Sequence, residues 1–546
     1  MNINEYLTSE LGKRSFLEGG YNQEDALVLS TLTYMKFEKS SVIYSSKNEN
    51  TINKVLNRYY GTAEYNLLPE NKKIFVNNLM NNDRYKNLII SDFSVKTSKL
   101  NGDGAEQFAA MTVNLPDGSN VVAFRGTDGT LEGWKEDFNF AYLQESPAQA
   151  LSKEYLNSVG KATKGKLYVT GHSKGGHEAI YSSMTCDEDV RNKIAKIYNF
   201  DGPGIRRDII DKYGENYRNI QNKLISYVPP TSIIGMLFVD HESIQCIKST
   251  NSFIMQHDQF SWEFDEDGNF SIDPKGVDST SKFLNKTLDD TLDGLTQQER
   301  NILINTIWEF AVKGHPKNFD DAFKEYRDSL SKAGKLKFIS KLLNDFNNLS
   351  IEKKEVLTKA LSVFCVASVN NGAIDYARTS VDKLILDTKE KLRKNLDNFM
   401  NLCGFLGVNP LLVQVAGQIC NGILSGVNSV INSFLSWVEK KITDGKGITG
   451  GNYGVIRVNL DEITTLVNRL NSVKRRILAL DSDLDRLRRS LEWYEGYDYL
   501  IIALIDLLEV GYDSDIRKCI NYLDIVVNKM TTCEQILKQQ ALNMGG

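Results

Sequence analysis

The sequence predicts an α/β fold in roughly its first half and an all-α fold in the rest of its 546 residues. Three observations lead to this prediction. Short β-branched and aromatic runs alternate with helix-length segments between about residues 85 and 260, this strand pattern fades after about residue 275, and apolar residues recur at heptad spacing beyond residue 455. Alternating strands and helices are typical of βαβ units with a mostly parallel sheet, whereas heptads are typical of long packed helices.

Six runs have the composition of strands. They are NLIISDFSVK (87–96), FAAMTVNL (108–115), NVVAFRG (120–126), KLYVTG (166–171), IAKIYNFDG (194–202) and KLISYVP (223–229). Beyond residue 275 the chain is rich in Lys, Asn, Asp and Leu at helical spacing, so we expect the sheet domain to end there.

Residues 402–437 form the most apolar stretch of the chain. Six residues interrupt it: Asn409, Pro410, Gln414, Gln418, Asn421 and Asn428. A membrane-spanning helix needs about twenty predominantly apolar residues in a row. We therefore expect a buried or partner-facing helix, with contact at a lipid surface as the alternative.

The C-terminal region carries a heptad pattern after a glycine-rich segment, residues 443–454. One series is Ile463, Leu470, Ile477, Leu484 and Leu491, and the offset series is Leu466, Val473, Leu480 and Leu487. After a turn at 493–498, a second helix repeats the spacing with Ile516, Leu523, Met530 and Leu537. This pattern predicts a long helical hairpin. The expected domains are 1–275 (α/β), 276–445 (helical) and 446–546 (hairpin).

Composition excludes several classes of function. The net charge of −5 offers no clustered positive surface for nucleic acid. The N-terminus lacks the basic start and apolar core of a cleavable secretory signal, so export would follow another route. The seven cysteines are scattered without Cys-x-x-Cys pairs, which indicates neither a disulfide framework nor a zinc site. We expect no metal and no organic cofactor.

The motif GHSKG, residues 171–175, lies between a predicted strand and a predicted helix. This is the context of a nucleophile elbow, in which a serine occupies a strained turn and flanking glycines permit close backbone approach. Ser173 is therefore the candidate nucleophile. The alternative is a serine that only caps the helix.

An acyl-transfer site also needs donors for a developing oxyanion. The segment RGT, residues 125–127, ends an earlier strand and offers the N–H and hydroxyl groups of Thr127, while the Lys174 N–H offers a second donor. The following segment, residues 129–142, contains Trp134 and is a candidate lid.

Five histidines are candidates for the general base. His172 and His177 lie within or just after the elbow and are interpreted as packing residues, while His241 and His315 lie in less suitable contexts. His257, after the last strand-like segment, is the best candidate. Asp201 at the end of the next strand is the candidate acid that orients it, although an Asp at this turn is also a good cap for the Gly-Pro-Gly segment.

Together these residues resemble the class three lipases, a group of α/β-hydrolases, and more closely a bacterial lipase-like family. The matching stretches are residues 21–38, 107–142, 167–181, 197–204, 227–237 and 256–262. The resemblance implies Ser173 as nucleophile, His257 as base and Thr127 as oxyanion donor. It departs at the acid, since class three lipases place an Asp where this chain has Pro230-Thr231-Ser232. Asp201 remains favoured, with Asp240 second and Ser232 as a non-acidic substitute.

The C-terminal hairpin resembles the LXG and WXG targeting modules of type VII secretion substrates, which usually lie at the N-terminus. The two resemblances imply a serine lipase or phospholipase A that acts on glycerolipids at a membrane surface. They further imply an antibacterial toxin, cytoplasmic before export, with small helical WXG-like chaperones and an immunity protein as partners. The alternatives are an intracellular esterase or thioesterase, or a catalytically inactive hydrolase fold that acts as a scaffold.

Overall fold

The computed structural model describes residues 1–37, 43, 50–98, 106–127, 130–238, 243–312 and 348–372, and the single residues 386, 390 and 436. The chain divides into two compact units, Met1–Asn371 and Gly372–Gly546. The apolar stretch at 402–437 apart from residue 436, the predicted hairpin and Asp240 lie outside the described residues. Within the described part of the chain, no helix combines the length and apolar character needed to cross a bilayer.

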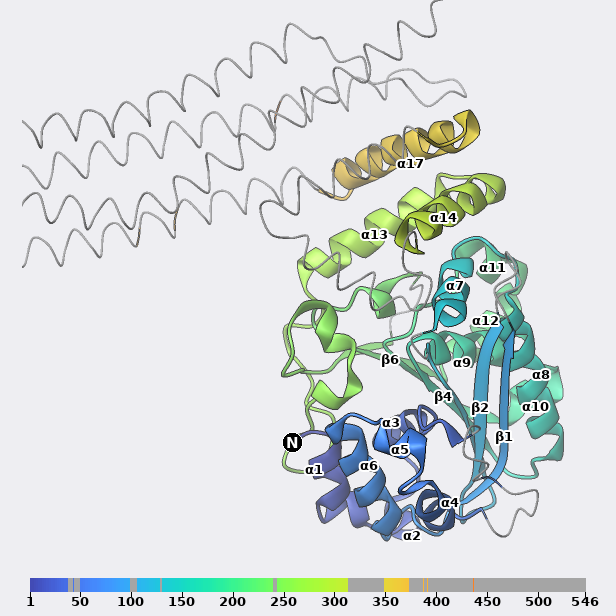
Figure 1. Cartoon of the computed structure of the whole chain (residues 1–546), viewed down its shortest axis with the longest axis vertical. Coiled ribbons are helices and arrows are strands. Elements are labelled where there is room, and N and C mark those ends of the chain that lie inside the picture. The colour runs from blue at the N-terminus through green and yellow to red at the C-terminus, as the bar shows by residue number, and fades with distance from the viewer. Residues whose placement is uncertain are drawn as a thin grey trace, which may run out of the picture. The chain divides into compact units, whose positions relative to one another are not determined.

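A seven-stranded mixed sheet forms the centre of the first unit, with its strands in chain order (Figure 1). The strands are β1 (Ile89–Ser98), β2 (Glu106–Asn114), β3 (Asn120–Phe124), β4 (Leu167–His172), β5 (Ile194–Phe200), β6 (Leu224–Val228) and β7 (Ile244–Cys246). The first three pair antiparallel, and β3 to β7 pair parallel. Each of the six predicted runs overlaps a strand, and this mixed α/β arrangement is consistent with an α/β-hydrolase fold.

The helices that connect the parallel strands lie on one face of the sheet. Each strand is added on the same side of its predecessor, and right-handed crossovers then place every connection on the same face. The helices are α7 (Leu131–Asn139), α8 (Pro147–Ala162), α9 (Lys174–Thr185), α10 (Glu188–Lys193), α11 (Arg207–Lys212) and α12 (Gly214–Gln221). Val169 of β4 packs with Leu156 of α8 and Ile180 of α9 in the core on this face.

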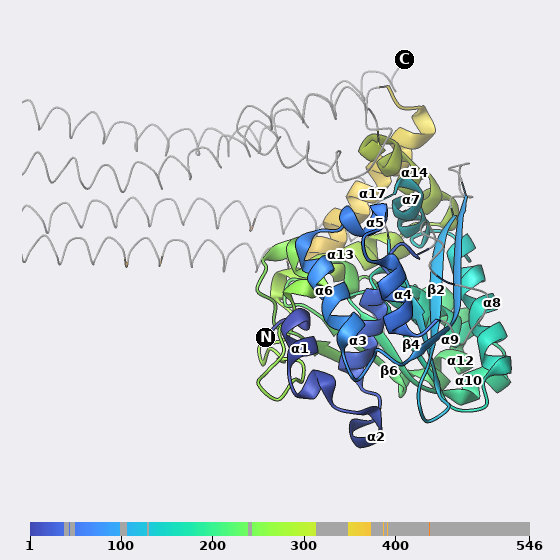
Figure 2. The same ribbon diagram turned by 60° about the horizontal axis from the view of Figure 1, so that its bottom comes forward.

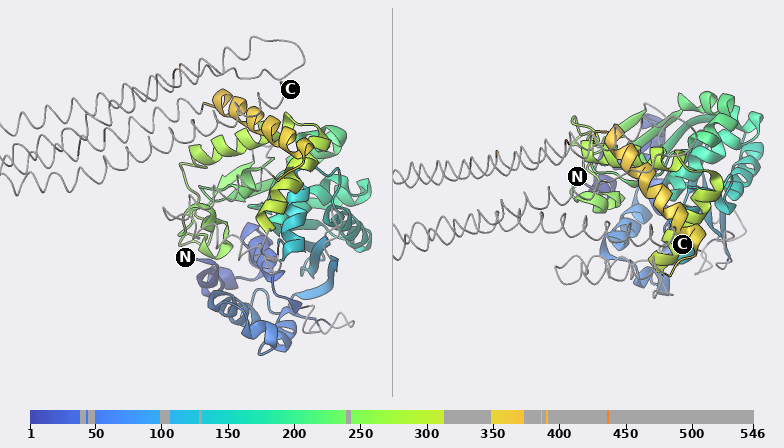
Figure 3. Two further views of the ribbon diagram at one scale, coloured as in Figure 1. Left: turned by 45° about the horizontal axis from the view of Figure 1, so that its top comes forward. Right: turned by 90° about the horizontal axis from the view of Figure 1, so that it is seen from above.

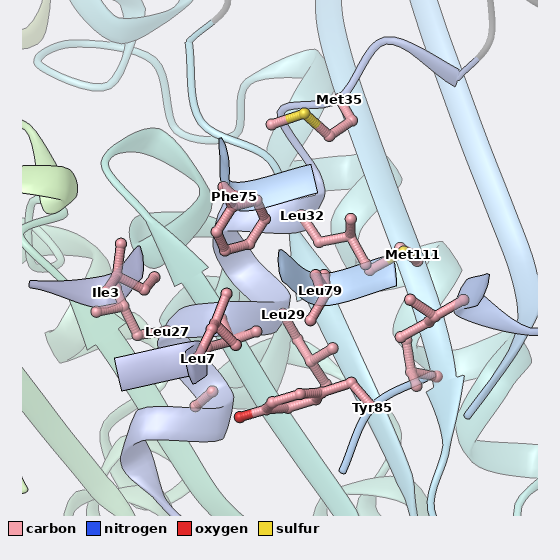
Figure 4. Packing of buried hydrophobic residues seen from close by; sticks show 14 of the residues in the cluster. Ile3, Leu7, Leu27, Leu29, Leu32, Met35, Phe75, Leu79, Tyr85 and Met111 are labelled. Carbon is pink, nitrogen blue, oxygen red and sulfur yellow. The ribbon is translucent and has the colours of Figure 1, made fainter. Parts of the chain in front are cut away.

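The opposite face is covered by the N-terminal segment (Figure 2). Its helices are α1 (Ile3–Thr8), α2 (Phe16–Gly19), α3 (Gln23–Leu32), α4 (Ile52–Tyr59), α5 (Ala63–Asn66) and α6 (Glu70–Asn81). Leu29 and Leu32 of α3, Phe75 and Leu79 of α6 and Met111 of β2 belong to one buried cluster (Figure 4). Met111 and Val169 thus lie in different cores, as the alternation of side chains along strands requires.

Three helices follow the sheet within the first unit: α13 (Ser279–Asp293), α14 (Gln297–Val312) and α17 (Ile351–Asn370). They confirm the helical character predicted for these parts of the chain. In Figure 3, α14 lies beside α7, and the rings of Phe138 and Trp308 are 5.5 Å apart. Asn285 of α13 donates to the Ser232 carbonyl at 3.3 Å. Helices α13 and α14 therefore pack against the segments at the carboxyl end of the sheet, and α17 packs against these two helices.

Candidate active site

The candidate residues converge where four neighbouring parallel strands end. Phe124 of β3 is paired with Gly171 of β4, His172 of β4 with Phe200 of β5, and Phe200 with Tyr227 of β6. Residues that follow these pairs therefore emerge side by side at the carboxyl edge, the usual location of ligand sites in parallel sheets. They are the 125–127 segment, Ser173, Asp201 and the 229–232 loop.

Ser173 sits in the tight turn that the GHSKG motif predicts. Its backbone has φ 58° and ψ −131°, a conformation that costs a non-glycine residue about 1–3 kcal/mol. Its N–H donates to the Phe200 carbonyl at 2.9 Å, which fixes the turn to β5. A Cβ at Gly171 would lie 2.1 Å from the Gly175 oxygen, and one at Gly175 would lie 2.2 Å from the Phe124 oxygen. Both glycines are therefore required by close backbone approach.

Lys174 begins helix α9 directly after this turn. Its N–H has no acceptor among the described residues, so it is free to donate at the positive end of the helix. Its side chain is fully buried, and its ammonium donates to the carbonyl and side-chain oxygens of Gln107 and lies 3.5 Å from Glu136. These contacts anchor the residue whose N–H is the candidate oxyanion donor.

Asp201 and His257 form a hydrogen-bonded pair. The Nδ1 atom of His257 lies 2.6 Å from Oδ2 of Asp201. The other carboxylate oxygen accepts a hydrogen bond of 2.5 Å from the Ser232 hydroxyl, which in turn accepts the Gly235 N–H. Asp201 is buried, and both of its oxygens have donors, as a buried carboxylate requires. Ser232 thus supports Asp201 from the position where class three lipases place their acid.

Asp201, like Ser173, has a left-handed backbone, with φ 50°. Its N–H donates to the Tyr227 carbonyl at 2.8 Å, so the turn is fixed to β6. Non-glycine residues in this region of φ/ψ space concentrate at functional sites. Among the described residues three non-glycine residues have positive φ, and two of them are the candidate nucleophile and the candidate acid; the third is Phe238.

His257 also lies beside the elbow. Its ring centroid is 4.7 Å from that of His172, the residue before Ser173. Within the described part of the chain the Ser173 hydroxyl has no hydrogen-bond partner, so the bond from nucleophile to base is not formed. Such bonds are often long in unliganded enzymes and shorten when substrate binds.

Thr127 follows strand β3 and has two hydrogen-bond donors, its hydroxyl and its N–H. Only one of them is free to donate to a substrate. Its hydroxyl donates to Oδ2 of Asp137 at 2.5 Å, whereas its N–H has no acceptor among the described residues. Burial raises the pKa of the Asp137 carboxyl to about 7. At alkaline pH the ionised carboxylate holds the Thr127 hydroxyl, which leaves the N–H as the free donor.

The predicted lid segment forms helix α7, which supplies Asp137. The helix is fixed to α14 through a hydrogen bond of 2.5 Å from the Lys135 ammonium to Asn305. A small pocket also adjoins the Asp201–His257 pair, with Pro229, Ile233 and Ile234 as its apolar lining. Among the described residues, no group of three or more His, Cys, Asp or Glu side chains is arranged to hold a metal ion.

Several residues of the site were not singled out as such from the sequence. Asp137 lies ten positions after Thr127 on an amphipathic helix, where nothing distinguishes it from a solvated carboxylate. His172 was interpreted as a packing residue, yet its ring contacts His257 and its Nε2 lies 2.9 Å from the His257 carbonyl oxygen. His177 does pack in the core: Phe140 stacks on it at 4.1 Å, and burial lowers its pKa to about 4.

Comparison with known proteins gives a match to one family model, described as Mbeg1-like, over residues 79–309. No curated protein matches the chain. Among solved structures, that of M37 lipase is similar over 40% of this chain and 69% of its own, at 13% identity and with a TM-score of 0.22, which is too low to bear on the fold. The chain is thus similar to the Mbeg1-like family over a segment that contains the whole sheet and all five predicted site residues.

Proposed function

We propose that this protein is a serine hydrolase that cleaves carboxylic esters through an acyl-enzyme. The observation that carries the proposal is the arrangement at the carboxyl edge of the sheet. A strained serine at a strand-to-helix turn lies beside a histidine whose Nδ1 bonds a buried carboxylate. This arrangement supports a catalytic triad, which is defined by geometry and roles rather than by sequence position.

In the proposed mechanism Ser173 attacks the ester carbonyl while Nε2 of His257 accepts the hydroxyl proton. Asp201 holds the Nδ1–H tautomer of His257 and stabilises the imidazolium that forms. The N–H groups of Thr127 and Lys174 donate to the oxyanion. His257 returns the proton to the departing alcohol, and water then hydrolyses the acyl-enzyme by the same steps in reverse.

The finer proposal is that the ester belongs to a glycerolipid or phospholipid, as in a lipase or phospholipase A. The resemblance of the site segments to class three lipases supports this substrate class. Met255, two residues before the candidate base, is a 63% exposed apolar side chain and is compatible with an apolar substrate.

A fluorophosphonate probe tests the proposal directly, because it phosphonylates only an activated serine. The full-length protein should react with the probe and hydrolyse a short-chain p-nitrophenyl ester. Ser173→Ala should abolish both, with a loss in rate of up to about a millionfold, while thermal unfolding shows an intact fold. A wild-type protein that neither labels nor hydrolyses would support the scaffold alternative. Lipid analysis of membranes treated with wild type and Ser173→Ala then identifies the acyl and head groups.

We also propose that the protein is exported by a type VII secretion system as an antibacterial toxin. The support is the heptad pattern of residues 455–542, which lies outside the described residues and resembles the LXG and WXG targeting modules. The expected partners are small helical chaperones on the hairpin and an immunity protein in the producing cell.

A further inference from the structure

The candidate base is carried by a short 3-10 turn, η6 (Phe253–His257), rather than by the sheet. A segment of this kind needs specific contacts to hold an imidazole in place, because no strand ladder fixes its backbone. Two side chains bond its last carbonyl groups. The indole of Trp262 donates to the Gln256 carbonyl at 2.8 Å, and Nε2 of His172 lies 2.9 Å from the His257 carbonyl oxygen.

The partners of His172 determine its tautomer. A carbonyl oxygen can only accept, so Nε2 of His172 must carry the proton and donate to His257. Its Nδ1 lies 2.8 Å from the Tyr34 hydroxyl, which then donates to it. Burial lowers the pKa of His172 well below its usual range, so the ring stays neutral and this pattern persists at physiological pH.

The Tyr34–His172 pair links the parts of the site that must be held together. His172 is the residue before the nucleophile, and its ring packs 4.7 Å from that of His257. A Cβ at Gly126, next to Thr127, would lie 2.1 Å from the Tyr34 hydroxyl and 2.5 Å from the His172 carbonyl oxygen. The pair therefore contacts the oxyanion segment, the elbow and the base segment at once.

We propose that Tyr34 and His172 are positioning residues that fix the backbone of His257 and so place its imidazole between Ser173 and Asp201. The inference rests on the proposed function, since it assigns a role to residues that act through the proposed base. In this proposal neither side chain contacts the substrate. The alternative is that both are ordinary core residues whose hydrogen bonds contribute only to stability.

Four variants of the full-length protein separate these two roles. His172→Leu removes both hydrogen bonds of the His172 ring. Tyr34→Phe removes only the hydroxyl that donates to Nδ1 of His172. His172→Gln keeps an N–H that can reach the His257 carbonyl. The fourth, Tyr34→Phe combined with His172→Leu, tests whether the two residues act as one unit.

Matched controls come from helix α9, which follows the elbow. Nδ1 of His177 bonds the Gly204 carbonyl at 2.8 Å, and the Tyr181 hydroxyl bonds Glu145 at 2.7 Å. His177→Leu and Tyr181→Phe therefore remove similar hydrogen bonds from a buried histidine and from a tyrosine, with no contact to His257. Thermal unfolding measured for every variant separates loss of stability from loss of rate.

We expect a selective loss of kcat on a soluble p-nitrophenyl ester. A base displaced by about 1 Å can cost ~100-fold, so His172→Leu should lose about that much and Tyr34→Phe about tenfold, each with little change in KM. His172→Gln should recover part of the rate. The double variant should be no slower than His172→Leu alone, because coupled residues are not additive. The controls should keep kcat within about threefold of wild type at comparable loss of stability.

Two results would overturn the inference: losses in kcat that match those of the controls, or losses that add in the double variant. Fluorophosphonate labelling of wild type separates this failure from failure of the proposed function. If the wild-type protein reacts with the probe and the variants react as fast as the controls, only the positioning role is contradicted. A wild type that does not label contradicts the proposed function itself.

Discussion

At the scale of single residues, the candidate acid lies at a different position along the chain from the acid of class three lipases. Asp201 follows β5, whereas class three lipases take their acid from the loop after the next strand. In this chain Ser232 occupies that loop and donates to Asp201 at 2.5 Å. The sequence left Asp201, Asp240 and Ser232 open because the two turns become neighbours only through the pairing of β5 with β6. The structure brings Asp201 to His257, and Asp240 lies outside the described residues.

Substitution of Asp201 and of Ser232 should lower kcat by very different factors. Asp201→Asn removes the carboxylate that stabilises the imidazolium, and a loss of about ten thousandfold in kcat is expected by analogy with a known triad. Ser232→Ala leaves the charge but removes one donor to a buried carboxylate, for which we expect ~10-fold, the equivalent of one neutral hydrogen bond of about 1.4 kcal/mol.

The measurement is kcat on the soluble ester, with Ser249→Ala as a control, since Ser249 bonds Ser261 away from the pair. If Ser232→Ala cost as much as Asp201→Asn, the serine would be a full member of the catalytic group. If Asp201→Asn were nearly as active as wild type, Asp201 would be only a turn cap, and Asp240 would become the first residue to test.

At the scale of elements, the sequence predicted which segments form the sheet better than it predicted what covers the sheet. The β-branched runs identified β1 to β6, but β7 has only three residues, Ile244–Cys246, too few for a pattern. Helical spacing identified residues after 275 as helical without showing their packing. Spacing reveals which face of a helix is apolar but not its partner, so the contact of α13 with the Ser232 loop could not be foreseen.

Helix α13 also holds the loop after β6 through Asp289. The Phe238 N–H lies 3.2 Å from both Asp289 carboxylate oxygens, at a residue with φ 56°. Burial, together with the nearby Asp293 and Asp290 carboxylates, raises the pKa of Asp289 from 3.8 to about 7. Between these values the folded state binds a proton that the unfolded state has released. The resulting stabilisation is complete at low pH and is lost as pH rises through 7.

Asp289→Asn should therefore flatten the pH dependence of the free energy of unfolding. The free energy of unfolding of the variant, relative to that of wild type, should be about 1–2 kcal/mol higher at pH 8 than at pH 4. A pKa shift corresponds to ~1.4 kcal/mol per unit, and the expected value is smaller than the full shift would give because solvent reaches the side chain. Urea unfolding at pH 4, 6 and 8 measures this. Glu352→Gln, at an exposed carboxylate of α17, is the control, and equal slopes for both variants would contradict the assignment.

At the scale of the whole molecule, the first unit contains every part of the proposed chemistry. The sheet, its two covering layers and helices α13, α14 and α17 all belong to Met1–Asn371. The division at residue 371 suggests that hydrolysis and export are separable, because the heptads that resemble a targeting module lie in the second unit.

A chain that ends at Asn371 should therefore keep kcat on a soluble ester within about threefold of full length, since distant, independent parts contribute additively. The same chain should fail to bind small helical chaperones in a pull-down with purified components and should not be exported. Loss of esterase activity in a truncated protein that unfolds cooperatively would make the second unit part of the catalytic machinery. The targeting interpretation would then be withdrawn.

The order of the site residues along the chain has a consequence for biosynthesis. The proposed oxyanion donor, nucleophile, acid and base follow one another as Thr127, Ser173, Asp201 and His257. The indole that bonds the segment of the proposed base is Trp262. Synthesis proceeds from the N-terminus, and domains generally fold as units. A nascent chain that has not yet emerged past Trp262 has a nucleophile without a fixed base. Translation products that stop early would thus lack the proposed hydrolase activity.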